Sequence, residues 1–516
     1  MVGIDSKAGK RQGFILMTQA AGAGRMAENS RSIGGMNISA EIKPSLVESA
    51  GRASVTALAH QPVPPINEKD VIMKQGSVKA LKCLGIVAVV LALGYAILAV
   101  SASRSLNRVR AALEADGRPI EFADIIPAEV PESDNAALVY RRVVLQLKAT
   151  KAENGEKSLW DALKETLAES HNQINPDAPD PELAERFVQL FRQPAVTEAL
   201  ADLEAGSRKS GYWNDLDFRK GISLALPHLR ELSPLTEILC VNARIQSGLG
   251  DPAAAWSSIL AALRVADALS HEPLLYNQRV RATQFGIVVD TIQDLPYSSA
   301  TQAELVALLA AGESPTSWAA GFDSERIFAG EALFGGARSE RREKISMFGG
   351  LVDGEAKRSR SELSLYLLIG PLARFDRAAH MSVTDEMARM MLKPYSVEDS
   401  ETIQQLQDDL PWYCVVTRIM ASAVGSYRTV QTELLAQVRV TRAGLAVLQH
   451  REEQGAWPEA LPASADLVDP FTGEALIYQP NPKGFVLYSV GANLVDDTGI
   501  PGEEGRRDIV WLYSAE

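Results

Sequence analysis

The chain has 516 residues, of which 46% are hydrophobic, and a formal net charge of −13. That length fits about two or three domains, and the apolar content is sufficient for a packed core. The acidic balance gives no general electrostatic support for nucleic-acid binding, so we expect no nucleic-acid partner. Three cysteines are too few for a disulfide scaffold.

The dominant feature is an apolar run from Cys83 to Ser103, which holds no charged residue in 21 positions. A helix of that length spans about 30 Å, the hydrocarbon thickness of a bilayer. Lysines precede the run, as in a signal anchor whose N-terminus stays inside. We therefore expect residues 80–103 to be a single-pass transmembrane signal anchor in the cell membrane. The large C-terminal part would then be exported and face the periplasm or a comparable compartment.

Two other interpretations of the run are open. A signal peptide starting at Met73 would be cleaved near the small residues that end the run, but the run is longer than the usual apolar region of about 7–15 residues. A buried core helix would show a polar face over such a length.

Residues 1–72 are rich in Ala, Gly, Ser and charge and show no helical or strand period, which predicts disorder. A true start at Met73 would remove that segment.

Residues 104–410 show helical patterns, and we expect a large helical domain there. Residues 133–148 form one expected helix, with Ser133 and Asp134 as candidate caps. The clearest unit is a helical hairpin at residues 235–249 and 252–270. Glycines end its first helix, and the acidic residue just before the second helix caps it.

Two further features of this domain are predicted. The glycine-flanked basic segment at residues 335–360 is expected to be a surface insert. Cys240 and Cys414 lie in apolar helical surroundings and could form one disulfide in an oxidising compartment. The alternative is two separate buried thiols, because a sequence cannot show that the two side chains meet.

The last part, residues 411–516, begins with a long helical stretch that ends at Trp457 and Pro458. We expect Trp457 to be largely buried where this helix meets a β module. Runs at residues 475–479 and 485–490 flank a Pro/Asn/Gly turn and predict a β-hairpin, and a last strand is expected at residues 509–513.

The C-terminal part carries an ordered series of motifs. GAWP at 455–458 is followed by DPFTG at 469–473, by FVLYSVGAN at 485–493 and by an acidic loop. This series resembles a pseudopilin of type II secretion over roughly residues 430–516. It is also similar to the C-terminal module of a group of membrane-anchored planctomycete proteins with a helical domain. The predicted fold is mainly α, with one N-terminal transmembrane helix, a large helical exported domain and a small pilin-like α+β module with an antiparallel sheet.

The acidic loop carries the one metal site that the resemblance implies. Hard cations take about six to eight oxygen ligands, and a tight loop can combine carboxylates with backbone carbonyls. In the major pseudopilins the equivalent loop binds calcium, which implies calcium ligands here at Asp497 and Asp508 first, with Asp496 and Glu503 after them. The alternative is a solvated acidic turn that the adjacent arginines neutralise.

No catalytic residue is identified. The six histidines lie outside HExxH and zinc-ligand patterns, and the chain has no nucleophile elbow, phosphate-binding loop or dinucleotide motif. The pairs Asp215/Asp217 and Asp408/Asp409 are more typical of caps or a solvated face than of an acid/base pair.

The expected function is that of a membrane-anchored, exported protein without enzymatic activity, whose helical domain is an interaction or scaffold domain. Its partners would be the lipid bilayer and proteins of the cell envelope. One alternative is a component of a secretion or pilus-like system. Another is an exported envelope hydrolase with a site assembled from distant residues.

Overall fold

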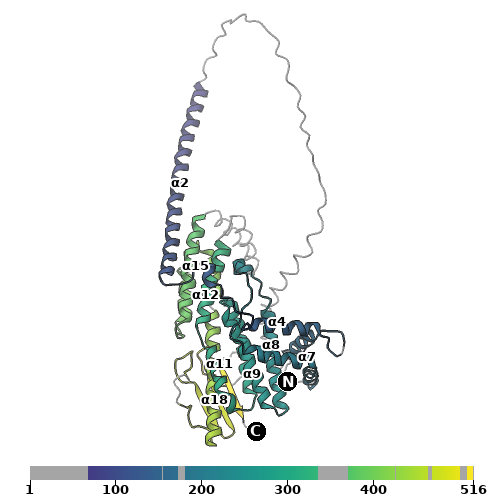
Figure 1. Cartoon of the computed structure of the whole chain (residues 1–516). Coiled ribbons are helices and arrows are strands. Elements are labelled where there is room, and N and C mark those ends of the chain that lie inside the picture. The colour runs from purple at the N-terminus through teal and green to yellow at the C-terminus, as the bar shows by residue number, and fades with distance from the viewer. Residues whose placement is uncertain are drawn as a thin grey trace, which may run out of the picture. The chain divides into compact units, whose positions relative to one another are not determined.

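The computed structural model describes residues 68–153, 155–171, 181–334, 370–424, 426–462, 468–499 and 508–514 (Figure 1). Most of these residues are helical, and three strands near the C-terminus form a small antiparallel sheet. The predicted fold class, mainly α with an apolar N-terminal helix and a small sheet, is confirmed. Residues 1–67, the whole basic segment at 335–360 and Glu503 lie outside the described residues.

The helices follow one another in chain order. Those before residue 335 are α2 (Glu68–Ala115), α3 (Phe122–Ile125), α4 (Ala136–Ala149), α5 (Leu159–His171), α6 (Pro181–Phe191), α7 (Pro194–Ser207), α8 (Leu229–Gly248), α9 (Pro252–Asp267), α10 (Leu275–Gln293), α11 (Ser299–Gly312) and α12 (Thr316–Phe334). Two 3-10 helices, η1 (Phe218–Ser223) and η2 (Ala268–His271), lie among them. The later ones are α15 (Gly370–Met391), α16 (Asp399–Asp408), α17 (Val415–Val424) and α18 (Ser426–Gln454).

Local capping explains where two of the predicted helices begin. The Ala254 amide donates to Asp251 Oδ1 at 3.0 Å, so the acidic residue before the second helix of the hairpin is its cap, as predicted. Helix α4 begins later than predicted, because Asn135 is its cap and accepts from the Ala137 amide at 3.0 Å. The helix therefore starts three positions after the first predicted cap.

The sheet has the order β1 (Ile477–Asn481), β2 (Gly484–Ser489) and β3 (Ile509–Ser514), with both pairs antiparallel. The turn between β1 and β2 is stabilised by Asn481, whose side-chain oxygen accepts from the Lys483 amide at 3.0 Å. At Gly484 a Cβ atom would lie 1.9 Å from the Tyr513 carbonyl oxygen. Only glycine fits this close approach of β2 to β3.

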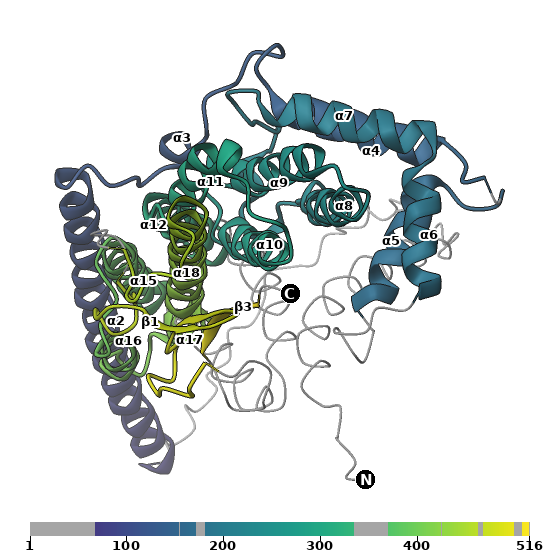
Figure 2. The same ribbon diagram turned by 90° about the horizontal axis from the view of Figure 1, so that it is seen from below.

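One hydrophobic core runs from α4 to β3 and is continuous across residues 410 and 411, the boundary expected from the sequence. Helices α8, α9 and α10 lie at its centre (Figure 2), and α18 packs against α10 and α11 on one side and against β2 and β3 on the other. Trp256, Trp318 and Trp511 are among its largest fully buried side chains. The long terminal helix thus belongs to the same core as the helical domain.

The joint between α18 and the sheet differs from the prediction in its central residue. Trp511 fills the joint, since a Cβ atom on Gly444 would lie 2.0 Å from the Trp511 ring. Trp457 is only half-buried and packs at the side of the sheet, 5.8 Å from Phe485 and 5.7 Å from Tyr513 between ring centroids. Trp457 lies at the predicted place but is less buried than predicted, because it follows the end of α18 rather than facing its middle.

Helix α2 is the only helix within the described residues that is long and apolar enough to cross a membrane. Residues Cys83–Ile97 are all exposed, whereas Leu98 is half-buried and Ala102 is fully buried. In both views the C-terminal half of α2 lies beside α15 (Figures 1 and 2). The helix therefore has a free part, Cys83–Ile97, and a C-terminal part, from Leu98 onward, that packs against the rest of the fold.

Candidate functional site

A polar site lies at the C-terminal end of α2. The Gly117 amide donates to the Glu114 carbonyl at 3.0 Å, and the Arg118 amide donates to the Leu113 carbonyl at 2.8 Å. With Gly117 at φ +67°, this is a Schellman motif, in which a left-handed glycine ends the helix. The motif turns the chain sharply, so that Arg118 points at α12 and α15.

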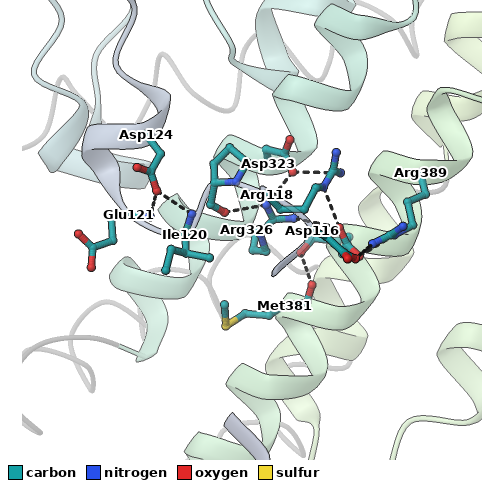
Figure 3. A network of polar contacts seen from close by, with 12 residues as sticks. Asp116, Arg118, Ile120, Glu121, Asp124, Asp323, Arg326, Met381 and Arg389 are labelled. Atoms are coloured by element: carbon teal, nitrogen blue, oxygen red, sulfur yellow. Dashed lines mark hydrogen bonds and ion pairs between the residues drawn. The ribbon is translucent and has the colours of Figure 1, made fainter. Parts of the chain in front are cut away.

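Arg118 connects these two helices. Its Nε atom donates to Asp385 Oδ1 of α15 at 3.0 Å, and its Nη2 atom forms an ion pair with Asp323 Oδ1 of α12 at 3.1 Å (Figure 3). The Arg118 side chain is only 17% exposed. A single guanidinium therefore links the end of α2 to two helices that are more than 200 residues further along the chain.

Arg326 of α12 lies behind this contact and is 1% exposed. Its Nη2 atom donates to Asp323 Oδ1 at 2.7 Å and to the Pro119 carbonyl oxygen at 2.8 Å. Its Nη1 atom lies 3.7 Å from Asp385 Oδ1. Arg326 thus binds both the carboxylates and the backbone that follows α2.

Arg389 closes the site on its outer side. It lies one helical turn after Asp385 and donates to Asp385 Oδ2 at 2.8 Å and to Asp116 Oδ2 at 2.6 Å. We call the six side chains of this network, which come from the turn after α2, from α12 and from α15, the junction: Asp116, Arg118, Asp323, Arg326, Asp385 and Arg389. Three arginines and three aspartates balance its formal charge.

Burial opposes ionisation inside the junction. Burial raises the pKa of the Asp323 carboxyl, and the neighbouring Arg326 and Arg118 guanidiniums act against that rise. Burial also lowers the pKa of Arg326. A buried ion-pair network of this kind contributes little net stability, but removing one of its charges is costly. We expect its main effect to be that it favours one packing arrangement over others.

A buried histidine lies beside the junction. His380 of α15 is 1% exposed, and its Nε2 atom has no hydrogen-bond partner in the part of the chain that the structure describes. Burial lowers the pKa of His380 to about 4, and the nearby Arg326 and Arg377 act in the same direction. Glu325, one residue before Arg326, shows the opposite shift, since desolvation raises its pKa to about 7.

A second polar cluster contains a histidine–carboxylate pair. Glu272 is 2% exposed and lies 2.9 Å from His228 Nε2, while Asn214 and Asn277 donate to the same carboxylate at 2.9 and 2.5 Å. Such a pair could orient a general base. Here both oxygens of Glu272 are occupied by three side chains. The cluster connects the loop before η1, the N-cap of α8 and the start of α10, and we assign it a structural role.

Two of the cavities in the described fold are candidate ligand sites. The larger, about 270 Å³, lies between the start of α12, the end of α15 and α18. Its buried Arg428 is bound by Asp399 at 2.8 Å and by Gln431 at 2.8 Å. The smaller, about 210 Å³, is lined by Tyr140 and Tyr212 among others. The buried Arg428 in the lining of the larger cavity is thus already neutralised by the protein.

The structure brings three of the four predicted calcium ligands into one loop. Asp508 accepts from the amides of Asp497 and Gly499 at 3.3 and 2.8 Å, and Asp496 accepts from the Tyr488 hydroxyl at 3.0 Å. Within the described residues no group of three His, Cys, Asp or Glu side chains is arranged to hold a metal ion. Glu503 lies outside those residues. The calcium site stays a prediction.

The remaining candidates from the sequence have simple positions. Cys240 and Cys414 are both free and buried, and burial raises the pKa of each thiol to about 12. Asp408 ends α16 and accepts from Gln404 one turn earlier at 3.0 Å, and Asp409 follows as the helix C-cap. These groups have ordinary roles at a core position and at a helix end.

The chain matches no known protein family, no curated protein and no solved structure. Sequence reasoning missed the junction, because its charged residues lie in three separate segments and each segment has the composition of an ordinary helix surface. The one local signal was Gly117, which ends the helix that contains the apolar run. The described fold is that of a mainly helical protein with one helix suited to a membrane and a small C-terminal sheet.

Proposed function

We propose that the chain is a single-pass membrane protein whose exported helical domain is a non-enzymatic scaffold for proteins of the cell envelope. The junction is the observation that carries this proposal. A domain on a flexible linker would rotate freely over the bilayer. Here a two-residue turn and an ion-pair network whose inner members, Arg118, Asp323 and Asp385, are largely buried link the domain to the end of α2. A scaffold that must present its surfaces at a constant height and orientation needs such a joint.

The first test of this proposal is topological. We expect the full chain to remain in the membrane fraction, and we expect protease added to intact spheroplasts to digest residues 104–516. A protected C-terminal part would contradict the export of the domain. Extraction of the protein by carbonate would contradict the anchor and support a cleaved signal.

The second test measures whether the helical domain is held rigidly relative to α2. The full chain is placed in lipid nanodiscs with a fluorophore on the helical domain, and the decay of fluorescence anisotropy is measured. The wild-type domain should rotate with the disc, whereas the double variant D323N/D385N should show an additional fast rotation. D294N, which removes a carboxylate from an exposed pair with Arg244, is the matched control and should leave the decay unchanged. Fast rotation in the wild-type chain would contradict a rigid connection between the helical domain and α2.

A pseudopilin-like role is the second candidate, and the packing of α18 on an antiparallel sheet favours it. In this chain, however, the apolar helix α2 and the sheet-covering helix α18 are separate elements. A filament-forming protein would be processed before its apolar helix. The N-terminal sequence of the mature protein therefore distinguishes the two candidates.

A further inference from the structure

The free part of α2 is too short to cross a bilayer by itself. Residues Cys83–Ile97 are exposed over 15 positions, and Lys82 precedes them. At about 1.5 Å per residue this part is about 22 Å long, whereas the hydrocarbon layer is about 30 Å thick. A shortfall of about 8 Å remains. If α2 spans the membrane, the hydrocarbon layer reaches the level where α2 packs against the fold.

The residues at that level belong to three elements. Leu98 packs against a small cluster in which the end of α12, the start of α15 and the start of α17 meet. The members of this cluster are Ala329, Phe334, Leu372, Ala373 and Val416. A Cβ atom on Gly370, the first residue of α15, would lie 3.8 Å from the Tyr95 hydroxyl. This corner of the fold is therefore level with the last third of the apolar run.

An aromatic side chain is exposed at the same corner. Trp412 is 76% exposed, and its ring centroid lies 5.7 Å from that of Tyr413. Tyr413 packs against the cluster that Leu98 contacts and lies 5.7 Å from Phe375. Leaving so large an apolar surface in water is unfavourable. Trp and Tyr are the side chains that favour the membrane–water interface, where an apolar ring and a polar group are both accommodated.

The charges around the corner fit phospholipid headgroups. Arg104 and Arg108 are exposed on α2 just after the apolar run, and Arg374 is exposed near the start of α15. These arginines are placed to meet lipid phosphates. Asp408 and Asp409 are exposed close to Trp412 in the chain. With both signs of charge present, a zwitterionic headgroup layer is a suitable partner.

We propose that this corner, with Trp412 at its tip, inserts into the headgroup and upper acyl region of the bilayer that α2 crosses. The occupant of the surface is phospholipid, and the helical domain rests on the membrane as well as being anchored in it. This inference depends on the proposed function, because it requires α2 to span the membrane. An amphipathic surface of this type commonly enters about 5–10 Å, which is close to the shortfall in the length of α2.

The test uses the full chain in phosphatidylcholine vesicles in which part of the lipid carries bromine on its acyl chains. The emission of Trp412 is obtained as the difference between the wild type and Trp412→Phe. We expect this difference emission to be blue-shifted and to lose most of its intensity in brominated lipid. Trp457→Phe is the matched control, since Trp457 follows the far end of α18, about 45 Å of helix away from α17. Its difference emission should be the same in both lipids.

Two results would overturn the inference, and they differ in meaning. Protein that floats with the vesicles but shows a red, unquenched Trp412 emission would retain the anchor and contradict the docking. Protein that does not float with the vesicles would contradict the anchor itself, and with it both proposals.

Discussion

Arg118 and Asp385 lie 267 positions apart in the chain, and the Arg118 Nε atom donates to Asp385 Oδ1 at 3.0 Å. This contact joins the first residues after α2 to the middle of α15. Because Arg118 also pairs with Asp323 at 3.1 Å, a change in the direction of α2 would separate charges that are nearly removed from water. The electrostatic cost of that separation is what makes the joint stiff.

Removal of a carboxylate from the junction should therefore be strongly destabilising. Asp323→Asn leaves Arg326, which is 1% exposed, without its closest carboxylate. We expect a loss of about 3 kcal/mol in the free energy of unfolding of the full chain in detergent, measured with a chemical denaturant. Asp294→Asn disrupts an exposed pair and should cost less than about 1 kcal/mol. Equal losses for the two variants would show that the ion pairs of the junction contribute no more to stability than an exposed ion pair does.

The joint between α18 and the sheet has its own test in Gly444→Ala. The added methyl group would lie 2.0 Å from the Trp511 ring, which is held between α18 and β2 and cannot move away freely. We expect a loss of about 1–3 kcal/mol in the free energy of unfolding. Gly248→Ala is the control at the end of α8, where a Cβ atom would meet nothing within 4 Å. That change should be neutral or slightly stabilising, because alanine favours the helix.

Sequence reasoning was most successful where the signal is local. The apolar run, the Asp251 cap and the β-hairpin are each encoded by neighbouring residues, and each is found in the structure. Sequence reasoning failed where the packing partner of a residue is distant in the sequence. Trp457 was expected to be largely buried at the joint but is only half-buried, and Trp511 fills the joint, because the small Gly444 on α18 leaves room for that ring. No local pattern reveals a pairing between a glycine and a tryptophan in different elements.

The calcium prediction can be tested on the same preparation. Calcium that binds the acidic loop stabilises the folded state and raises the melting temperature relative to chelator. Asp496→Asn should remove that rise, since among the described residues Asp496 accepts from Tyr488 and the Thr498 amide through Oδ1 and offers its other oxygen to a metal. Asp508→Asn is less informative, because Asp508 also holds the amides of Asp497 and Gly499. Identical melting curves in calcium and in chelator would leave the loop as an acidic turn.

His380 and Glu325 predict opposite dependences of stability on pH. The folded pKa of His380 is about 4, and a histidine in an unfolded chain titrates near about 6.5. Between these values the unfolded chain binds a proton that the folded chain does not bind. Stability should therefore fall as the pH falls from about 6.5 to about 4, by about 3 kcal/mol in total. Glu325 has a folded pKa of about 7, so the folded chain keeps this proton at pH values where the unfolded chain loses it, and the contribution to stability falls as the pH rises from about 4.5 to about 7.

The two contributions oppose each other in the wild type, and single variants separate them. His380→Asn removes the titrating ring, and its amide can replace the donor to the Glu325 carbonyl. This variant should be more stable at pH 4.5 than at pH 7, as the Glu325 contribution alone requires. Glu325→Gln should show the reverse, with stability falling steadily as the solution is acidified. The measurement is the free energy of unfolding of each full-length variant at both pH values, and parallel pH profiles for the two variants would contradict the burial of these groups next to the junction.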